Sequence, residues 1–335
     1  MQSHTDHDRI PGEIADIINK YCRFLIVTHD FPDGDGLGSQ IALYELLKNL
    51  NKEVFMVCSS EIPYQYTFLP NTDKIRKNLD DLPDECLDSN AVCLCLDSAD
   101  EKRFSFDIKM IKEKTSVLIN IDHHLGNSMY GNINLVNPSK SATAEMIYEL
   151  IEKYFKDSFN YNIAAGLYTG ILTDTGRFQY ENTSNNVHKV IGYLLEFGVQ
   201  PSAVYSCIYE NEPFERFGLI KLALRRIRIL KTGDLIYSYV LQKDFKKLGL
   251  PFSANDGIIE LLRTASGVKI AALIKQVGDN NFKVSLRSSD RQCSVADIAV
   301  KFGGGGHRLA AAYSQEGNLK NIIRDLISAI KSGSK

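Results

Sequence analysis

An imidazole and two carboxylates stand close together directly after a short apolar run near the N-terminus. His29, Asp33 and Asp35 follow residues 24–27, which have the pattern of a buried strand. Pro32 and the neighbouring glycines predict a loop here. Ligands bind beyond the carboxyl ends of strands in open parallel sheets, and mixed imidazole and carboxylate donors suit Mn²⁺ or a similar cation. The alternative is that the two acids serve only as turn or helix-cap residues.

Three further apolar runs end in the same way, with acidic or imidazole side chains. The runs are residues 91–96, 117–121 and 168–173. Their ends carry Asp97, then Asp122 with His123 and His124, and finally Asp174. Any one of these side chains could be a helix cap or a hydrogen-bonded core residue. Four such coincidences indicate one shared site at the edge of a sheet.

In their order and spacing, these four motifs resemble the signature motifs of the DHH phosphoesterase superfamily. Near the C-terminus, Phe302 is followed by four glycines and His307, which resembles the glycine-rich motif of the DHH-associated C-terminal domain. The similarity extends from about residue 24 to residue 330. It is strongest to the bacterial branch of nanoRNases and pAp phosphatases.

The resemblance implies a site with two Mn²⁺ ions per chain. One ion would be held by His29, Asp33 and Asp97. The other would be held by Asp35, Asp97, His123 and Asp174. Asp97 would therefore bridge the metals, and His124 would contact the scissile phosphate or the leaving oxygen. Asp122 is expected to orient a ligating histidine. Arg103 and Arg177 follow their aspartates closely, and they are either phosphate ligands or members of surface ion pairs.

Composition restricts the partners and the compartment. The formal net charge of −2 is not that of a protein that coats long nucleic acid, so a nucleotide partner should be short. The sequence has no apolar run long enough for a membrane helix, and residues 1–8 contain no signal-like apolar core. The seven cysteines include no C-x-x-C pair. These features predict a protein of the reducing cytoplasm.

The order of elements predicts a two-domain α/β protein. Strand and helix patterns alternate from residue 24 to residue 121, which is typical of a doubly wound, mostly parallel sheet with helices on both faces. Helical patterns then follow over residues 144–155, 163–172, 186–197 and 215–230. We expect a catalytic metal-binding domain over residues 1–200, a helical linker over 201–231 with a boundary near 231–234, and a smaller C-terminal α/β domain with a mixed sheet over 232–335.

The C-terminal domain carries candidate substrate-binding residues. Residues 282–287 alternate apolar and polar side chains, so Lys283, Ser285 and Arg287 share one face of a strand. Arginine can bind a phosphate through two hydrogen bonds. The glycine-rich motif offers backbone N–H groups to an anion, and its members are Gly304, Gly305, Gly306 and His307. The alternative is an ordinary flexible loop.

By resemblance, the expected activity is hydrolysis of short oligoribonucleotides such as nanoRNA, pApA and pGpG to mononucleotides, and of pAp to AMP and phosphate. One alternative is a manganese inorganic pyrophosphatase of the same superfamily, which would not need the combination of Arg287 and the glycine-rich motif. A second alternative is a non-catalytic nucleotide sensor, although every expected ligand position is filled. The main physiological substrate, the direction of attack and the oligomeric state, a homodimer included, stay open.

Overall fold

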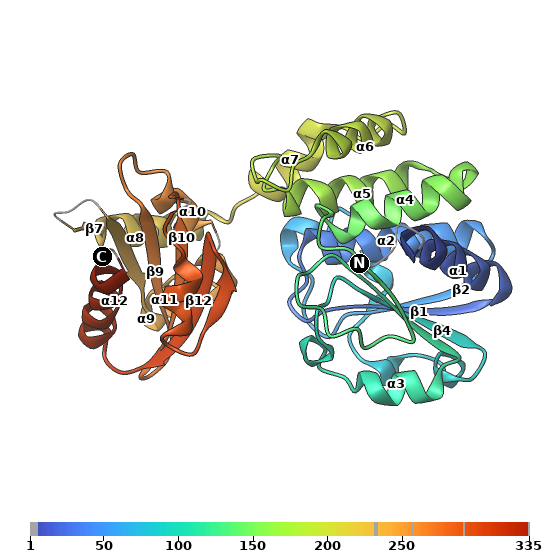
Figure 1. Ribbon diagram of the computed structural model, residues 1–335, viewed down its shortest axis with the longest axis horizontal. Coiled ribbons are helices and arrows are strands. Elements are labelled where there is room, and N and C mark those ends of the chain that lie inside the picture. The colour runs from blue at the N-terminus through green and yellow to red at the C-terminus, as the bar shows by residue number, and fades with distance from the viewer. Residues whose placement is uncertain (1–5, 231–233, 256, 291, 334–335) are drawn as a thin grey trace. The chain divides into compact units, whose positions relative to one another are not determined.

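The computed structural model describes residues 6–230, 234–255, 257–290 and 292–333, and its contacts divide the chain into two compact units (Figure 1). Unit 1 is Met1–Asn211 and unit 2 is Glu212–Lys335. The segment expected to be a helical linker is therefore shared between the units, and most of the predicted boundary at 231–234 lies outside the described residues. In the part of the chain that the structure describes, none of the helices has the length and apolarity needed to cross a membrane.

Unit 1 contains a fully parallel sheet of six strands in the order β3-β2-β1-β4-β5-β6. The strands are β1 (Arg23–Thr28), β2 (Glu53–Val57), β3 (Ile75–Arg76), β4 (Ala91–Leu96), β5 (Val117–Asp122) and β6 (Ile133–Val136). The chain moves outward from β1 to β3 and then returns to the other side of β1 with β4. Ligands bind at such a reversal of strand order, beyond the carboxyl ends of the strands.

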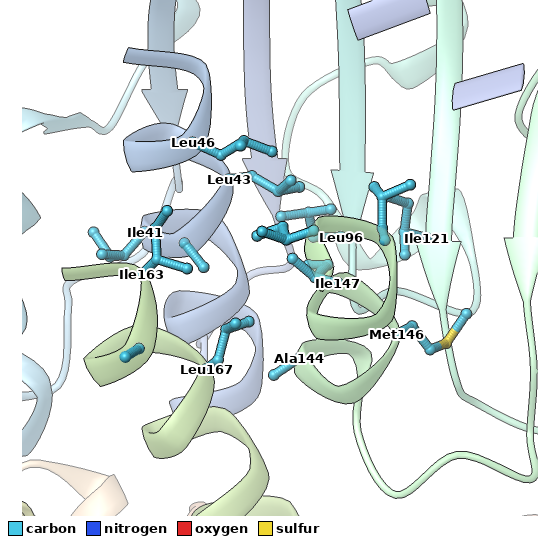
Figure 2. Packing of buried hydrophobic residues seen from close by; sticks show 14 of the residues in the cluster. Ile41, Leu43, Leu46, Leu96, Ile121, Ala144, Met146, Ile147, Ile163 and Leu167 are labelled. Atoms are coloured by element: carbon cyan, nitrogen blue, oxygen red, sulfur yellow. The ribbon is translucent and has the colours of Figure 1, made fainter. Parts of the chain in front are cut away.

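Helices cover both faces of this sheet, which confirms the predicted doubly wound class. The helices of unit 1 are α1 (Asp6–Lys20), α2 (Gly34–Asn49), α3 (Ile108–Lys114), α4 (Thr143–Tyr154), α5 (Tyr161–Asp174), α6 (Asn185–Leu195) and α7 (Pro201–Tyr209). Leu43 and Leu46 of α2 pack with Ile147 of α4 against the strand residues Leu96 and Ile121 (Figure 2). On the opposite face α3 packs against alternate residues of β1, β4 and β5.

The backbones of α2 and α5 touch at a pair of glycines. A Cβ atom on Gly38 would lie 2.2 Å from the carbonyl oxygen of Gly166, and one on Gly166 would lie 2.6 Å from that of Gly38. Neither position has room for a side chain. This close approach brings the start of α2 toward α5, which ends at Asp174.

Two predicted element boundaries were wrong. The segment after His29 was expected to be a loop through Asp35, but α2 already begins at Gly34, because Asp33 caps it by accepting hydrogen bonds from the amides of Asp35 and Gly36. The helix predicted over 215–230 ends earlier. The chain leaves it to form a short strand that pairs antiparallel with the next strand of unit 2.

Unit 2 contains a mixed sheet of six strands in the order β11-β12-β10-β9-β8-β7, as the sequence predicts. Among the described strands of this sheet, only β8 and β9 pair in parallel. The strands are β7 (Arg228–Ile229), β8 (Leu235–Val240), β9 (Ile270–Gly278), β10 (Asn281–Ser288), β11 (Gly305–His307) and β12 (Ala310–Glu316). The helices α8 (Phe214–Arg225), α9 (Gln242–Leu248) and α10 (Ile258–Arg263) pack on one face, and α11 (Val295–Val300) and α12 (Leu319–Gly333) pack on the other.

Candidate metal centre

His29 follows β1 and is almost fully buried. Its Nδ1 lies 2.8 Å from the carbonyl oxygen of Asp30, and because a carbonyl only accepts, this contact, the shorter of the two at Nδ1, favours the tautomer with the proton on Nδ1. The other ring nitrogen, Nε2, is then a lone-pair donor. It is buried and has no hydrogen-bond partner among the described residues, and it lies 3.6 Å from Asp97 Oδ2 and 3.9 Å from Asp33 Oδ1. An orphaned imidazole nitrogen among carboxylates is what a metal ligand requires.

Asp97 lies at the centre of the cluster, directly after β4. It is buried, and its backbone has a left-handed φ of 57° that is uncommon for a residue with a side chain. Its two carboxylate oxygens face different neighbours. Oδ2 faces His29, whereas Oδ1 lies 3.7 Å from His123 Nε2 and accepts a hydrogen bond of 3.1 Å from Thr143 Oγ1. This geometry suits a carboxylate that bridges two cations.

A second group of donors surrounds His123 at the end of β5. His123 Nε2 lies 3.2 Å from Asp174 Oδ2 and 3.8 Å from Asp35 Oδ2, while Nδ1 lies 3.3 Å from the carbonyl oxygen of Lys140. Asp35 is oriented by the first backbone amides of α4, because its oxygens accept hydrogen bonds from Thr143 (2.6 Å) and Ala144 (2.9 Å). Sequence reasoning missed this contribution of α4, since Thr143 lies far from the acidic motifs.

The candidate ligand atoms form compact sets. Within each set the atoms lie within 4.8 Å of one another, and the three sets are His29–Asp33–Asp97, Asp35–His123–Asp174 and Asp97–His123–His124. Burial and the nearby carboxylates of Asp35 and Asp33 raise the pKa of both Asp97 and Asp174 well above the usual range. So many carboxylates cannot ionise together in a buried site without compensating positive charge. The residues present therefore fit a site for divalent cations.

His124 is held by Asp122, and this contact differs from the expected one. His124 Nδ1 lies 2.7 Å from Asp122 Oδ1, while Asn127 Nδ2 donates to Asp122 Oδ2 over 2.6 Å. Asp122 was expected to orient a ligating histidine, but its partner is the histidine assigned to the substrate. The hydrogen bond that His124 donates to Asp122 raises the pKa of His124 despite the partial burial of the ring. Asn127 was not anticipated from the sequence.

The two arginines with open roles lie in different environments. Arg103 Nη2 lies 3.2 Å from His29 Nδ1, and this contact is not a hydrogen bond when Nδ1 carries its proton, because both groups then only donate. The carbonyl of Arg103 accepts a hydrogen bond from the amide of Asp30. Arg177 instead places its guanidinium over the ring of Tyr209, at 5.0 Å from the centroid. Arg103 thus borders the metal centre.

In unit 2, Arg287, Ala310 and His307 stand in one row across three neighbouring strands. Arg287 of β10 pairs with Ala310 of β12, which pairs with His307 of β11. Cross-strand partners point to the same face, so Arg287 and His307 lie about 10 Å apart with a small side chain between them. We call these three residues the phosphate row.

The glycines of the motif are needed for strand pairing. A Cβ atom on Gly304 would lie 2.3 Å from the carbonyl oxygen of Ala312, and one on Gly306 would lie 2.6 Å from that of Ala310. Residues 305–307, which we had expected to form part of a loop, are the short strand β11 instead. The motif therefore brings His307 close to β12.

Comparison with known proteins finds a matching family model in each of the two units. The model of the DHH family, N-terminal domain, matches residues 23–171, and that of the DHHA1 domain matches residues 233–332. The bifunctional oligoribonuclease and PAP phosphatase NrnA of Thermus thermophilus is 32% identical over 307 residues, which cover 91% of this chain and 88% of that protein. NrnA of Bacillus subtilis is 27% identical over 315 residues, covering 90% and 92%.

Among solved structures, an exopolyphosphatase-related protein from Bacteroides fragilis has the same fold. It superposes with a TM-score of 0.89 at 22% identity, and the match covers 97% of this chain and 96% of that one. The order of motifs, the two matched domains and the relatives together show that this chain is an NrnA-like member of the DHH phosphoesterase superfamily.

Proposed function

We propose that the protein is a metal-dependent hydrolase that cleaves short oligoribonucleotides, such as nanoRNA, pApA and pGpG, to mononucleotides and converts pAp to AMP and phosphate. The observation that carries the proposal is the position of Asp97, whose two oxygens face two separate sets of imidazole and carboxylate donors. The names of the relatives from Thermus thermophilus and Bacillus subtilis support the substrate class.

Two Mn²⁺ ions are the proposed cofactors, because imidazole nitrogens among carboxylates suit this ion better than they suit Mg²⁺. His29, Asp33 and Asp97 would hold one ion. The other would be held by Asp35, Asp97, His123 and Asp174. When bound, such a pair lowers the pKa of a shared water and neutralises charge on a phosphoryl group.

His124 is the proposed proton donor to the leaving oxygen. Its hydrogen bond to Asp122 favours the imidazolium form, and it fixes the orientation of the ring. A water oxygen forms a bond to phosphorus as the P–O bond to the leaving group breaks, and the leaving oxygen takes the proton from His124. The Asp122 carboxylate stabilises the imidazolium until that transfer. Asn127 holds Asp122 in place through its other oxygen.

The phosphate row is proposed to bind the part of the nucleotide that does not react. The Arg287 guanidinium suits a phosphate, and the exposed His307 ring can donate to a phosphate or stack on a base. Gly304 and Gly306 contribute by letting the backbone of β11 approach β12 closely. Gly305 contributes differently, because the space beside its Cα is open to an approaching ligand.

The test is a comparison of rates on pAp, pApA, a five-nucleotide RNA and pyrophosphate, each with Mn²⁺ and with Mg²⁺. We expect hydrolysis of the first three substrates, faster with Mn²⁺, and loss of activity after prolonged incubation with EDTA. The Asp97→Asn variant, which keeps the shape of the side chain, is the matched control for contaminating nucleases. A preference for pyrophosphate would favour the pyrophosphatase alternative, and tight pAp binding without turnover would favour a sensor.

A further inference from the structure

Glu260 of α10 holds the side chain of Arg287 in a fixed position. Its Oε1 accepts hydrogen bonds from Arg287 Nε and lies equally close to Nη2, with both distances 3.1 Å. The third nitrogen, Nη1, donates to the carbonyl oxygen of Leu286 over 3.1 Å. Both side chains of the ion pair are about two-thirds buried, with 30% and 29% of their surface exposed. Arg287 is therefore ordered before any ligand arrives.

These contacts use one part of the guanidinium and leave another part available. A guanidinium has five N–H groups, arranged along a side edge (Nε and Nη2) and an end edge (Nη1 and Nη2). Glu260 occupies the side edge, and Leu286 takes one hydrogen of Nη1. Among the contacts of the described residues, one hydrogen on each of Nη1 and Nη2 is left, and two parallel N–H groups match two oxygens of a phosphate.

We propose that Glu260 is a positioning residue that orients Arg287 so that its end edge binds a substrate phosphate. The inference rests on the proposed role of Arg287 in substrate binding. Holding a flexible arginine in its binding conformation removes part of the entropy cost of association, which is worth roughly three- to tenfold in affinity. The carboxylate also repels a phosphate, but solvent and salt screen that repulsion at a partly exposed site.

The experiment measures KM and kcat for pAp in Glu260→Ala, Glu260→Gln and wild-type protein, with Glu316→Ala as the matched control. Glu316 is an exposed acid of the same unit and is the last residue of β12. We expect Glu260→Ala to raise KM by roughly three- to tenfold with a smaller change in kcat. Glu260→Gln keeps an amide oxygen that accepts from Arg287, so its KM should stay within about twofold of the wild-type value.

A double variant tests whether the effect passes through Arg287. In the Arg287→Ala background, Glu260→Ala should add no further loss, because its partner is already absent. A lower KM in both Glu260 variants would overturn the inference, since the carboxylate would then act mainly by repulsion. The inference would also be overturned if Glu260→Ala raised KM as much in the Arg287→Ala background as it does in the wild-type protein.

Two further outcomes separate this inference from the proposed function. A lower melting temperature in Glu260→Ala with an unchanged KM would overturn the inference alone, because Glu260 would then only support the fold. An unchanged KM for pAp in Arg287→Ala would remove the proposed role of Arg287 in substrate binding, and the inference with it.

Discussion

At the scale of single residues, the chemistry of the site depends on how each polar atom is held. The protons on Nδ1 of His29 and of His123 are directed to backbone carbonyls, so both Nε2 atoms face carboxylates as lone-pair donors. His124 uses its Nδ1 differently, since that nitrogen meets Asp122. Histidine therefore serves as a candidate metal ligand at two positions and as a candidate proton donor at a third, because the partner of Nδ1 differs between them.

Asp97→Ala should be the most damaging single change in the metal centre. Loss of the Asp97 carboxylate removes a donor from both sets of ligands. We therefore expect turnover on pAp to fall at least a hundredfold, on the order of what the loss of one major stabilising group costs. Elemental analysis should show less than two bound metals per chain. A folded Asp97→Ala protein with full metal content and near-normal turnover would contradict the assignment.

At the scale of elements, the contact between α2 and α5 brings acidic residues together from distant parts of the chain. Asp35 stands in the first turn of α2, and Asp174 is the last residue of α5. Gly38 and Gly166 allow the two backbones to touch about one turn further along α2 from Asp35. Small residues inside these helices thus serve the site, although they carry no chemistry themselves.

Gly38→Val should separate α2 from α5 and weaken both folding and metal binding. The added side chain would meet backbone atoms that cannot move aside, so we expect a loss of about 3 kcal/mol or more, at the upper end of overpacking effects. Thermal unfolding without Mn²⁺ measures the loss of stability, and the shift of the melting temperature on adding Mn²⁺ measures metal binding. Gly192→Ala in α6 is the matched control, because nothing lies within 4 Å of its added Cβ, and it should leave stability unchanged or raise it.

An ion pair between elements of unit 2 predicts a pH dependence of local stability. Asp244 of α9 is nearly buried, and its hydrogen bond with Arg226 lowers the pKa of its carboxyl although burial acts in the opposite direction. Because the folded pKa lies below the unfolded value of about 3.9, the pair stabilises above that pH and the stabilisation is lost as pH falls through the folded pKa.

Asp244→Asn should accordingly lower the stability of unit 2 by about 1–3 kcal/mol near neutral pH, the size expected for a charged hydrogen bond. The difference from wild type should shrink as the pH falls below about 4. Hydrogen exchange of the β8 amides reports it locally, because α9 follows β8 directly. A difference that stayed constant down to acid pH would show that the ionised carboxylate is not what stabilises the pair.

At the scale of the whole molecule, the candidate functional residues are divided between the two units. Unit 1 holds the candidate metal ligands, and unit 2 holds the phosphate row, in which Arg287 pairs with Glu260. Binding energy from a remote part of a substrate can be used to orient the reacting part. This division predicts that changes in unit 2 slow the hydrolysis of nucleotides more than that of small esters, which have no second group for unit 2 to bind.

Arg287→Ala and His307→Ala should slow hydrolysis of pAp and short RNA by on the order of tenfold or more, about what one lost charge-assisted contact costs. A generic ester such as bis-p-nitrophenyl phosphate lacks the remote group, so its hydrolysis should fall much less. The measurement is kcat/KM for each substrate in each variant. Equal losses on both substrates would mean that the phosphate row only supports the fold.

The sequence by itself determined the fold class, the parallel sheet of unit 1, the mixed sheet of unit 2 and the motifs. Period-two and helical patterns are local properties, so the strands ending at Thr28, Leu96 and Asp122 could be anticipated. The order and spacing of the motifs were enough to identify the family. Because the carboxyl ends of parallel strands share one edge, proximity of His29, Asp97 and the Asp122 motif could also be expected.

Only the tertiary structure decided how these residues are used. The two directions of the Asp97 carboxylate and the pairing of Asp122 with His124 depend on contacts with residues elsewhere in the chain, such as Thr143 and Asn127. The short strand β11 likewise exists because β12 offers it a partner. Spacing along a chain restricts which residues can meet, but hydrogen bonds between distant segments choose the rotamer and the protonated nitrogen, and those choices define the site.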